Sequence, residues 1–263
     1  MFSCKSQWRK AIIVDGKLTN MSGHSKWATI KRAKGAADLK RGLTFTKISN
    51  AITIAVRTSG GITDINSNFK LRLAVEAAHA ANMPKDNVER AIQKAVGKNA
   101  GFLSEVLYEG FAPEGVSVII EAATDNTLRT TSEIKSIFNK GGGNFSQPGS
   151  VAYQFEQKGI IVVNKNGKTI DELFEAALES GAEDIEDTGD KAVVETSFAN
   201  LSKVREALAK KGITAEKAEI VRKPLMPITI SDEEKLNSVV NFLDKLEELD
   251  DVQKVYSNLA SNQ

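Results

Sequence analysis

The run Ile160-Ile161-Val162-Val163 is the stretch that decides the fold of much of this chain. Four consecutive β-branched residues favour a strand, because such side chains pack well on a pleated surface. The chain then alternates between helical and β-rich patterns, with a helix over 170–180, strands at 183–187 and 191–196, a helix over 200–211 and a strand over 216–223. This βαββαβ order predicts a split βαβ, ferredoxin-like unit over residues 158–224.

The segments on either side of this unit each have too few helices and strands to form a domain alone. The first, residues 101–157, has strand patterns at 105–110, 116–123 and 150–156, and a helix that ends near Lys140. The second, residues 225–263, has strand patterns at 227–230 and 252–257 around a helix over 232–248. Because neither segment can cover its own apolar faces, we predict that they join into a second split βαβ unit with residues 158–224 inserted. One continuous sheet is the alternative.

Local signals mark where several of these helices begin and end. Asp125-Asn126-Thr127 supplies N-cap chemistry, and Gly141-Gly142-Gly143 ends the helix that follows. Ser231 is a candidate cap for the last helix, with Glu234 at the capping-box position.

The pattern from Lys26 to about Gly97 is helical, which predicts a small basic helical domain over residues 21–100. A polar, Ala-rich segment runs from Trp27 to Leu39, and helices are predicted at about 43–58, 67–81 and from Pro84 to Gly97. The predicted fold class is therefore α+β in three domains, one helical and two of the ferredoxin-like type. Residues 1–20 are expected to be a disordered extension, with Met21 as the working start or, as the alternative, a transit segment before it.

Positive charge is concentrated near the front of the chain. Residues 22–58 contain eight basic residues and one acidic residue, a net charge of +7 in a chain whose total is +1. Residues 171–195 carry ten acids and one base, and residues 226–263 carry eight acids and three bases. A basic segment of this kind points to a polyanionic partner, of which a phosphate backbone is the commonest. A solvated helix face is the simpler alternative, as is solubility for the acidic runs.

The candidate nucleic-acid-binding residues are the cations of this segment together with two aromatic rings. We expect the cations to neutralise phosphates, Trp27 to stack on a base or pack at the interface, and His24 to contact a phosphate or base. The residues are His24, Lys26, Trp27, Lys31, Arg32, Lys34, Lys40, Arg41 and Lys47.

The sequence offers little for catalysis. Cys4 is the only cysteine and His24 and His79 are the only histidines, so a structural zinc site of the usual Cys/His kind cannot be built. Gly167-Lys168-Thr169 lacks the earlier glycine of a phosphate loop, because Val162 stands at that position. We therefore expect no catalytic residue, metal, cofactor or small-molecule substrate. With no run long enough to span a bilayer, we also expect no membrane partner and a cytoplasmic location.

Short motifs spread along the chain resemble the YebC/PmpR family. They are Met21-Ser22-Gly23-His24-Ser25-Lys26-Trp27, Lys40-Arg41-Gly42, Ala81-Asn82-Met83-Pro84-Lys85-Asp86-Asn87, Tyr108-Glu109-Gly110, Thr124-Asp125-Asn126 with Arg129-Thr130, Gly142-Gly143-Asn144, Gly149-Ser150-Val151-Ala152-Tyr153 and Leu249-Asp250-Asp251-Val252-Gln253. Each motif is weak alone, and together they are specific.

The resemblance implies a helical N-terminal domain followed by two α/β domains around a cleft. Family members are described as DNA-binding transcriptional regulators or as proteins that act with the ribosome, among them a mitochondrial translational activator. The implied function is regulation of gene expression through DNA, with ribosomal RNA as the alternative partner. Lysine contacts phosphates of both kinds alike, so the sequence does not separate them.

Overall fold

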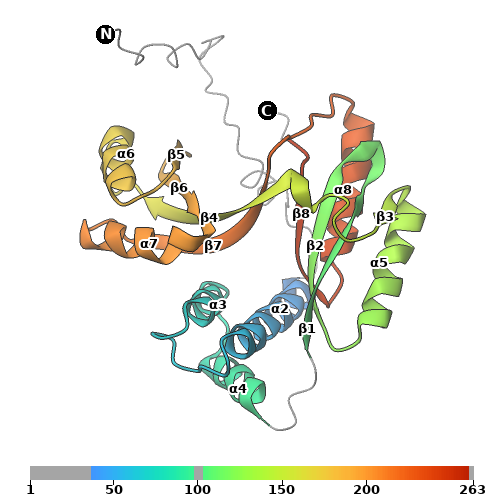
Figure 1. Cartoon of the computed structure of the whole chain (residues 1–263), viewed down its shortest axis with the longest axis horizontal. Coiled ribbons are helices and arrows are strands. Elements are labelled where there is room, and N and C mark those ends of the chain that lie inside the picture. The colour runs from blue at the N-terminus through green and yellow to red at the C-terminus, as the bar shows by residue number, and fades with distance from the viewer. Residues whose placement is uncertain (1–36, 98–102, 261–263) are drawn as a thin grey trace.

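The computed structural model describes residues 37–97 and 103–260 of the chain. It has the predicted α+β class: a helical domain is followed by two four-stranded antiparallel sheets, each with helices on one face (Figure 1). None of the helices in these residues has both the length and the apolar character needed to cross a bilayer.

Within residues 37–97, the helical domain has three helices that share one core. These are α2 (Ala37–Thr58), α3 (Phe69–Ala80) and α4 (Lys85–Val96). Ile52, Leu71 and Ala78 are fully buried between them. Asn68 joins two of the helices: its side chain caps α3 by accepting from Leu71 N–H and also donates to the carbonyl of Ala55 in α2. The sequence predicts a helix that begins near residue 43, after a separate polar segment over 27–39. Instead, α2 already includes Ala37–Leu39 and continues through Gly42 without a break.

The first sheet is built from both ends of the α/β part of the chain. Its order is β3-β1-β2-β8, and one face is covered by two helices. The elements are β1 (Ser104–Phe111), β2 (Ser117–Thr124), α5 (Thr127–Gly141), β3 (Asn144–Ser146), α8 (Glu233–Glu247) and β8 (Val252–Ser257). β2, α5 and β3 form a split βαβ unit, because β1 lies between the two strands.

The second sheet is made from the chain between these two segments. Its elements are β4 (Phe155–Asn164), α6 (Ile170–Glu179), β5 (Asp184–Asp187), β6 (Lys191–Ser197), α7 (Leu201–Lys210) and β7 (Ala215–Pro224). The order β5-β6-β4-β7 is that of a ferredoxin-like unit, as the sequence predicts. Short 3-10 turns occur at η1 (Pro113–Gly115), η2 (Ala152–Gln154) and η3 (Phe198–Asn200).

Three local predictions were wrong, each for an identifiable reason. Ser150–Glu156 is not a separate strand, because a buried carboxylate binds the backbone N–H groups of Gly149, Val151 and Ala152 that a ladder would use. Residues 227–230 form only one bridge, from Ile228 to Leu259, next to Pro227, which has no N–H to donate. α8 is capped by Asp232 and not by Ser231. The N-cap predicted within residues 125–127 is confirmed, and the capping residue is Asn126.

The two sheets meet through a small apolar core. Ile119 and Tyr256 of the first sheet pack with Phe155 and Val221 of the second. An ion pair between Arg222 and Glu121, with Nε and Oε1 2.8 Å apart, crosses the same junction. β2 is therefore buried on both faces, which explains its almost continuous apolar sequence.

Candidate nucleic-acid interface

The described residues include only part of the predicted basic surface. His24, Lys26, Trp27, Lys31, Arg32 and Lys34 lie outside them. Lys40 and Arg41 fall in the first turns of α2, where the backbone is described. Their role, like that of the six residues before them, stays a prediction.

Lys47 lies at the junction between the helical domain and the first sheet. Its side chain is half-buried, and the ammonium donates to the carbonyl oxygen of Glu247, the last residue of α8. A cation at this position is favoured by the negative end of the helix dipole. Lys47 therefore contributes to domain packing, and its ammonium is less available to a phosphate than an exposed lysine is.

Four further cations of the helical domain face solvent, and sequence reasoning did not single them out. Lys70 lies on α3, and Lys85, Arg90 and Lys94 lie on α4. All four are exposed, and within the described residues none of them makes an ion pair. The signal that could have found them is the helical pattern itself, because each lies off the buried apolar stripe of its own helix.

Cations in the two sheets are mostly held by carboxylates. Lys158 pairs with Glu156 and Glu183, and Lys223 pairs with Glu195. The hydrogen bond that the Lys158 ammonium donates to Glu183 contributes most to raising the pKa of Lys158. These ammonium groups are already neutralised by the protein, so the sheets offer a phosphate less than the helical domain does.

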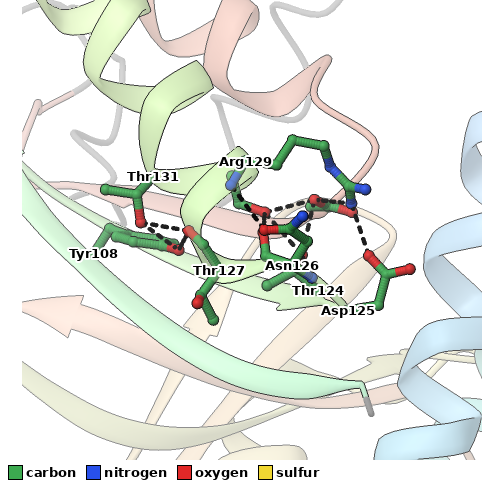
Figure 2. A network of polar contacts seen from close by, with 9 residues as sticks. Tyr108, Thr124, Asp125, Asn126, Thr127, Arg129 and Thr131 are labelled. Carbon is green, nitrogen blue, oxygen red and sulfur yellow. Dashed lines mark hydrogen bonds and ion pairs between the residues drawn. The ribbon is translucent and has the colours of Figure 1, made fainter. Parts of the chain in front are cut away.

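Two of the quoted motifs, more than 100 residues apart, meet in one polar network at the start of α5 (Figure 2). Asp251 Oδ2 accepts from Arg129 Nη2 at 2.8 Å, from Thr130 Oγ1 at 2.6 Å and from Thr124 Oγ1 at 3.0 Å. Arg129 also pairs with Asp125 at 3.0 Å. The network ties the loop before β8 to the end of β2 and the first turn of α5.

The electrostatics of this network favour an ionised Asp251. Burial by itself raises the pKa of the Asp251 carboxyl, but the hydrogen bonds from Arg129, Thr130 and Thr124 outweigh it and hold the pKa below its ordinary value. The open hollow beside the network, of about 500 Å³, is lined by Glu133, Glu248 and Asp250 as well. Such a lining repels phosphate, so this hollow is not the expected nucleic-acid surface.

The motif that contains Glu109 meets the motif that begins at Gly149. Glu109 is buried, with only 2% of its surface exposed. Its carboxylate accepts from the backbone N–H groups of Gly149 and Val151 at 2.7 Å and of Ala152 at 2.9 Å. Burial raises the pKa of the Glu109 carboxyl, but these three donors and the charge of Arg222 keep it below the ordinary value. Glu109 thus fixes the loop that connects the first sheet to β4.

Nothing in the described residues assembles the groups needed for a metal site. They contain no cluster of three or more histidine, cysteine or acidic side chains suited to a metal ion. His79 is exposed at the end of α3. Thr169, which follows Gly167-Lys168, caps α6 in a capping box with Glu172, so this segment serves to start a helix.

Comparison with known proteins identifies the chain's relatives. Residues 25–98 match the profile described as the TACO1/YebC protein N-terminal domain, and residues 103–259 match that of the TACO1/YebC second and third domain. The chain belongs to the TACO1/YebC family. The family match covers the predicted cations from Lys26 to Lys47, and His24 lies just outside it.

Relatives of the TACO1/YebC family cover nearly the whole chain. A protein of Desulforapulum autotrophicum, named a probable transcriptional regulatory protein, is 47% identical over 90% of this chain and 96% of its own length. One of the same name from Persephonella marina is 47% identical over 92% and 97%. The crystal structure of a conserved hypothetical protein from Aquifex aeolicus superposes with a TM-score of 0.78 at 44% identity, covering 89% of this chain and 96% of that one.

Proposed function

We propose that this chain is a non-enzymatic regulator of gene expression that binds DNA through its basic N-terminal domain. The observation that carries the proposal is the separation of charge. Residues 22–58 have a net charge of +7, whereas residues 103–260 contain 28 acidic and 17 basic residues. The names of the relatives support a role in regulation.

The cations before and at the start of α2 are proposed to neutralise phosphates, and those of α3 and α4 to extend the surface. The first group is Lys26, Lys31, Arg32, Lys34, Lys40 and Arg41, with His24 and Trp27 beside it, and the second is Lys70, Lys85, Arg90 and Lys94. Phosphate contacts give affinity and position without reading sequence. Lys47 contributes less, because its ammonium is bound to Glu247.

Ribosomal RNA is the alternative partner, which would make the protein a translation factor. A cationic surface binds either backbone, so charge alone does not decide between them. Cosedimentation of the protein with ribosomes from a lysate, competed with duplex DNA or with RNA, separates the two. Release by duplex DNA at the lower concentration favours the regulator of transcription, and release by RNA favours the translation factor.

The central test replaces two adjacent cations of the basic segment. We expect the Lys31→Glu, Arg32→Glu variant to bind a labelled DNA duplex at least about a hundredfold more weakly, since two contacts become repulsive. Fluorescence anisotropy measures the affinity, and thermal unfolding checks that the fold is intact.

A matched control carries the same charge change outside the family match. Lys5→Glu, Arg9→Glu lowers the net charge equally but lies before residue 25, where the match begins. We expect its affinity to stay within about threefold of the wild type. Equal affinity of the Lys31, Arg32 variant and the wild type would remove the basic segment from the proposed function.

A further inference from the structure

An exposed apolar patch lies on the two segments that connect the sheets. Tyr153, Leu225 and Met226 are 72%, 57% and 75% exposed. Leu225 N–H donates to the carbonyl oxygen of Gln154 at 2.8 Å, which continues the β4–β7 ladder beyond its last pair, Phe155 and Pro224. This bond holds residues 153–154 beside residues 225–226, so the three exposed apolar side chains lie on adjacent segments.

Tyr153 differs from the other tyrosines of the chain. Tyr108 and Tyr256 are buried, at 7% and 4% exposure, whereas the ring of Tyr153 is held in solvent. Tyr153 also ends the motif that begins at Gly149, whose backbone is bound by Glu109. A packing role explains the two buried rings but not this one.

The backbone under this ring is fixed by groups on both sides. Val151 and Phe155 are buried, and Ala152 N–H donates to Glu109. Gln154 accepts from Ser117 Oγ at 2.8 Å through its amide oxygen and donates to the Tyr153 hydroxyl at 3.3 Å. A ring held in this way loses little conformational freedom when a flat partner stacks on it.

The size of the patch limits what can bind there. An aromatic side chain buries about 150–250 Å² at most, so three side chains fall short of the roughly 800 Å² per partner of a standard protein interface. Neither a second copy nor a globular partner could be held by this patch alone. A single base is small and flat, and the phosphates attached to it can be held elsewhere.

We propose that Tyr153, with Leu225 and Met226 beside it, stacks on an unpaired base of the bound nucleic acid. The inference rests on the proposed function, since the helical domain supplies the phosphate contacts. It adds that the preferred ligand has a single-stranded or looped segment, whether RNA or DNA. Because every base has an aromatic face, the site tolerates different sequences.

The test uses the full chain and two single-stranded probes. These are oligonucleotides of about twelve nucleotides, one oligo-U and one oligo-dT, each with a central 2-aminopurine whose fluorescence falls on stacking. We expect Tyr153→Ala to weaken binding about five- to a hundredfold and to abolish the quenching. Tyr153→Phe keeps both, because it keeps the ring. If Tyr153→Ala binds both probes more weakly, the site stacks on bases of RNA and DNA alike. If it binds only one probe more weakly, that probe shows which nucleic acid the site prefers.

Phe174→Ala is the matched control, because Phe174 is an exposed aromatic residue on α6, 42% exposed and away from the patch. It should leave affinity and quenching unchanged. If Tyr153→Ala keeps the wild-type affinity and quenching, the stacking site is overturned and the proposed function is not. The same follows if Tyr153→Phe loses as much affinity as Tyr153→Ala. A wild type that binds a DNA duplex but neither single-stranded probe also overturns the stacking site, whereas binding that is undiminished in the Lys31, Arg32 variant overturns the proposed function instead.

Discussion

The helical domain and the two sheets use charged side chains in opposite ways. Residues 37–97 contain nine basic and five acidic residues, whereas residues 103–260 contain 17 basic and 28 acidic ones. In the sheets, the carboxylates of Glu109 and Asp251 are bound by several donors each. In the helical domain, Lys70, Lys85 and Lys94 are exposed and make no ion pair among the described residues.

The difference shows that the number of charges matters less than whether the protein itself satisfies them. A buried carboxylate bound by several N–H or O–H groups stabilises the loops around it, and losing it leaves those donors unpaired. An exposed ammonium group gives up little on meeting a phosphate and releases a counterion from the nucleic acid. Changes in the sheets should therefore alter stability, and changes in the helical domain should alter affinity.

Removing the Glu109 carboxylate should have the largest effect. We expect Glu109→Ala to lower the free energy of unfolding by about 3 kcal/mol, because three backbone N–H groups lose a charged acceptor. Urea denaturation measures it. Glu105→Ala, on the exposed start of the same strand, is the control and should stay within about 0.5 kcal/mol of the wild type. Equal losses in both variants would contradict a structural role for Glu109.

Asp251→Asn should have a smaller effect on stability, of about 2 kcal/mol, because Asp251 binds three side chains near the surface. Asp250→Asn, at the exposed neighbour, is the matched control. The folded-state pKa of Asp251 is lowered. Its contribution is therefore complete above the unfolded-state pKa of about 3.9 and is lost as the pH falls through the folded-state value. The difference between wild type and variant should shrink below about pH 4, and a difference that grows there would contradict this account.

Reversing exposed charges in the helical domain should change affinity and leave stability alone. We expect Lys70→Glu, Lys85→Glu, Lys94→Glu to weaken DNA binding about tenfold, close to 1.4 kcal/mol. The control, Lys168→Glu, Lys203→Glu, Lys210→Glu, makes the same change at exposed lysines of the second α/β unit and should cost less than about threefold. Equal losses would show that net charge, and not the helical domain, governs binding.

Sequence reasoning predicted the contiguous second sheet better than the discontinuous first one. The run at Ile160 and the helices after it have strong local periodicity, so their order could be read directly. The strand predicted at 150–156 is wrong before Phe155, where β4 begins, because the backbone at Val151 and Ala152 is bound by Glu109, some 40 residues earlier. β3 has only three residues, too few to show a pattern.

The candidate site shows the same division. The excess of positive charge before residue 58 is visible in the sequence, because it depends on composition alone. The hydrogen bond from the Lys47 ammonium to the carbonyl oxygen of Glu247, 200 residues later, cannot be predicted from the sequence. Nor can the exposure of Tyr153, since the alternation around it resembles that of a strand whose residues are half buried.

The salt dependence of nucleic-acid binding tests the central claim most directly. For the full chain and a DNA duplex, the logarithm of the association constant should fall linearly with the logarithm of salt concentration, with a slope of about −0.9 for each phosphate contact. At least four contacts predict a slope of roughly −3.6 or steeper for the wild type, and a shallower slope for the Lys31→Glu, Arg32→Glu variant. A slope near zero, or equal slopes for the two proteins, would contradict the claim that the basic N-terminal domain holds the phosphates.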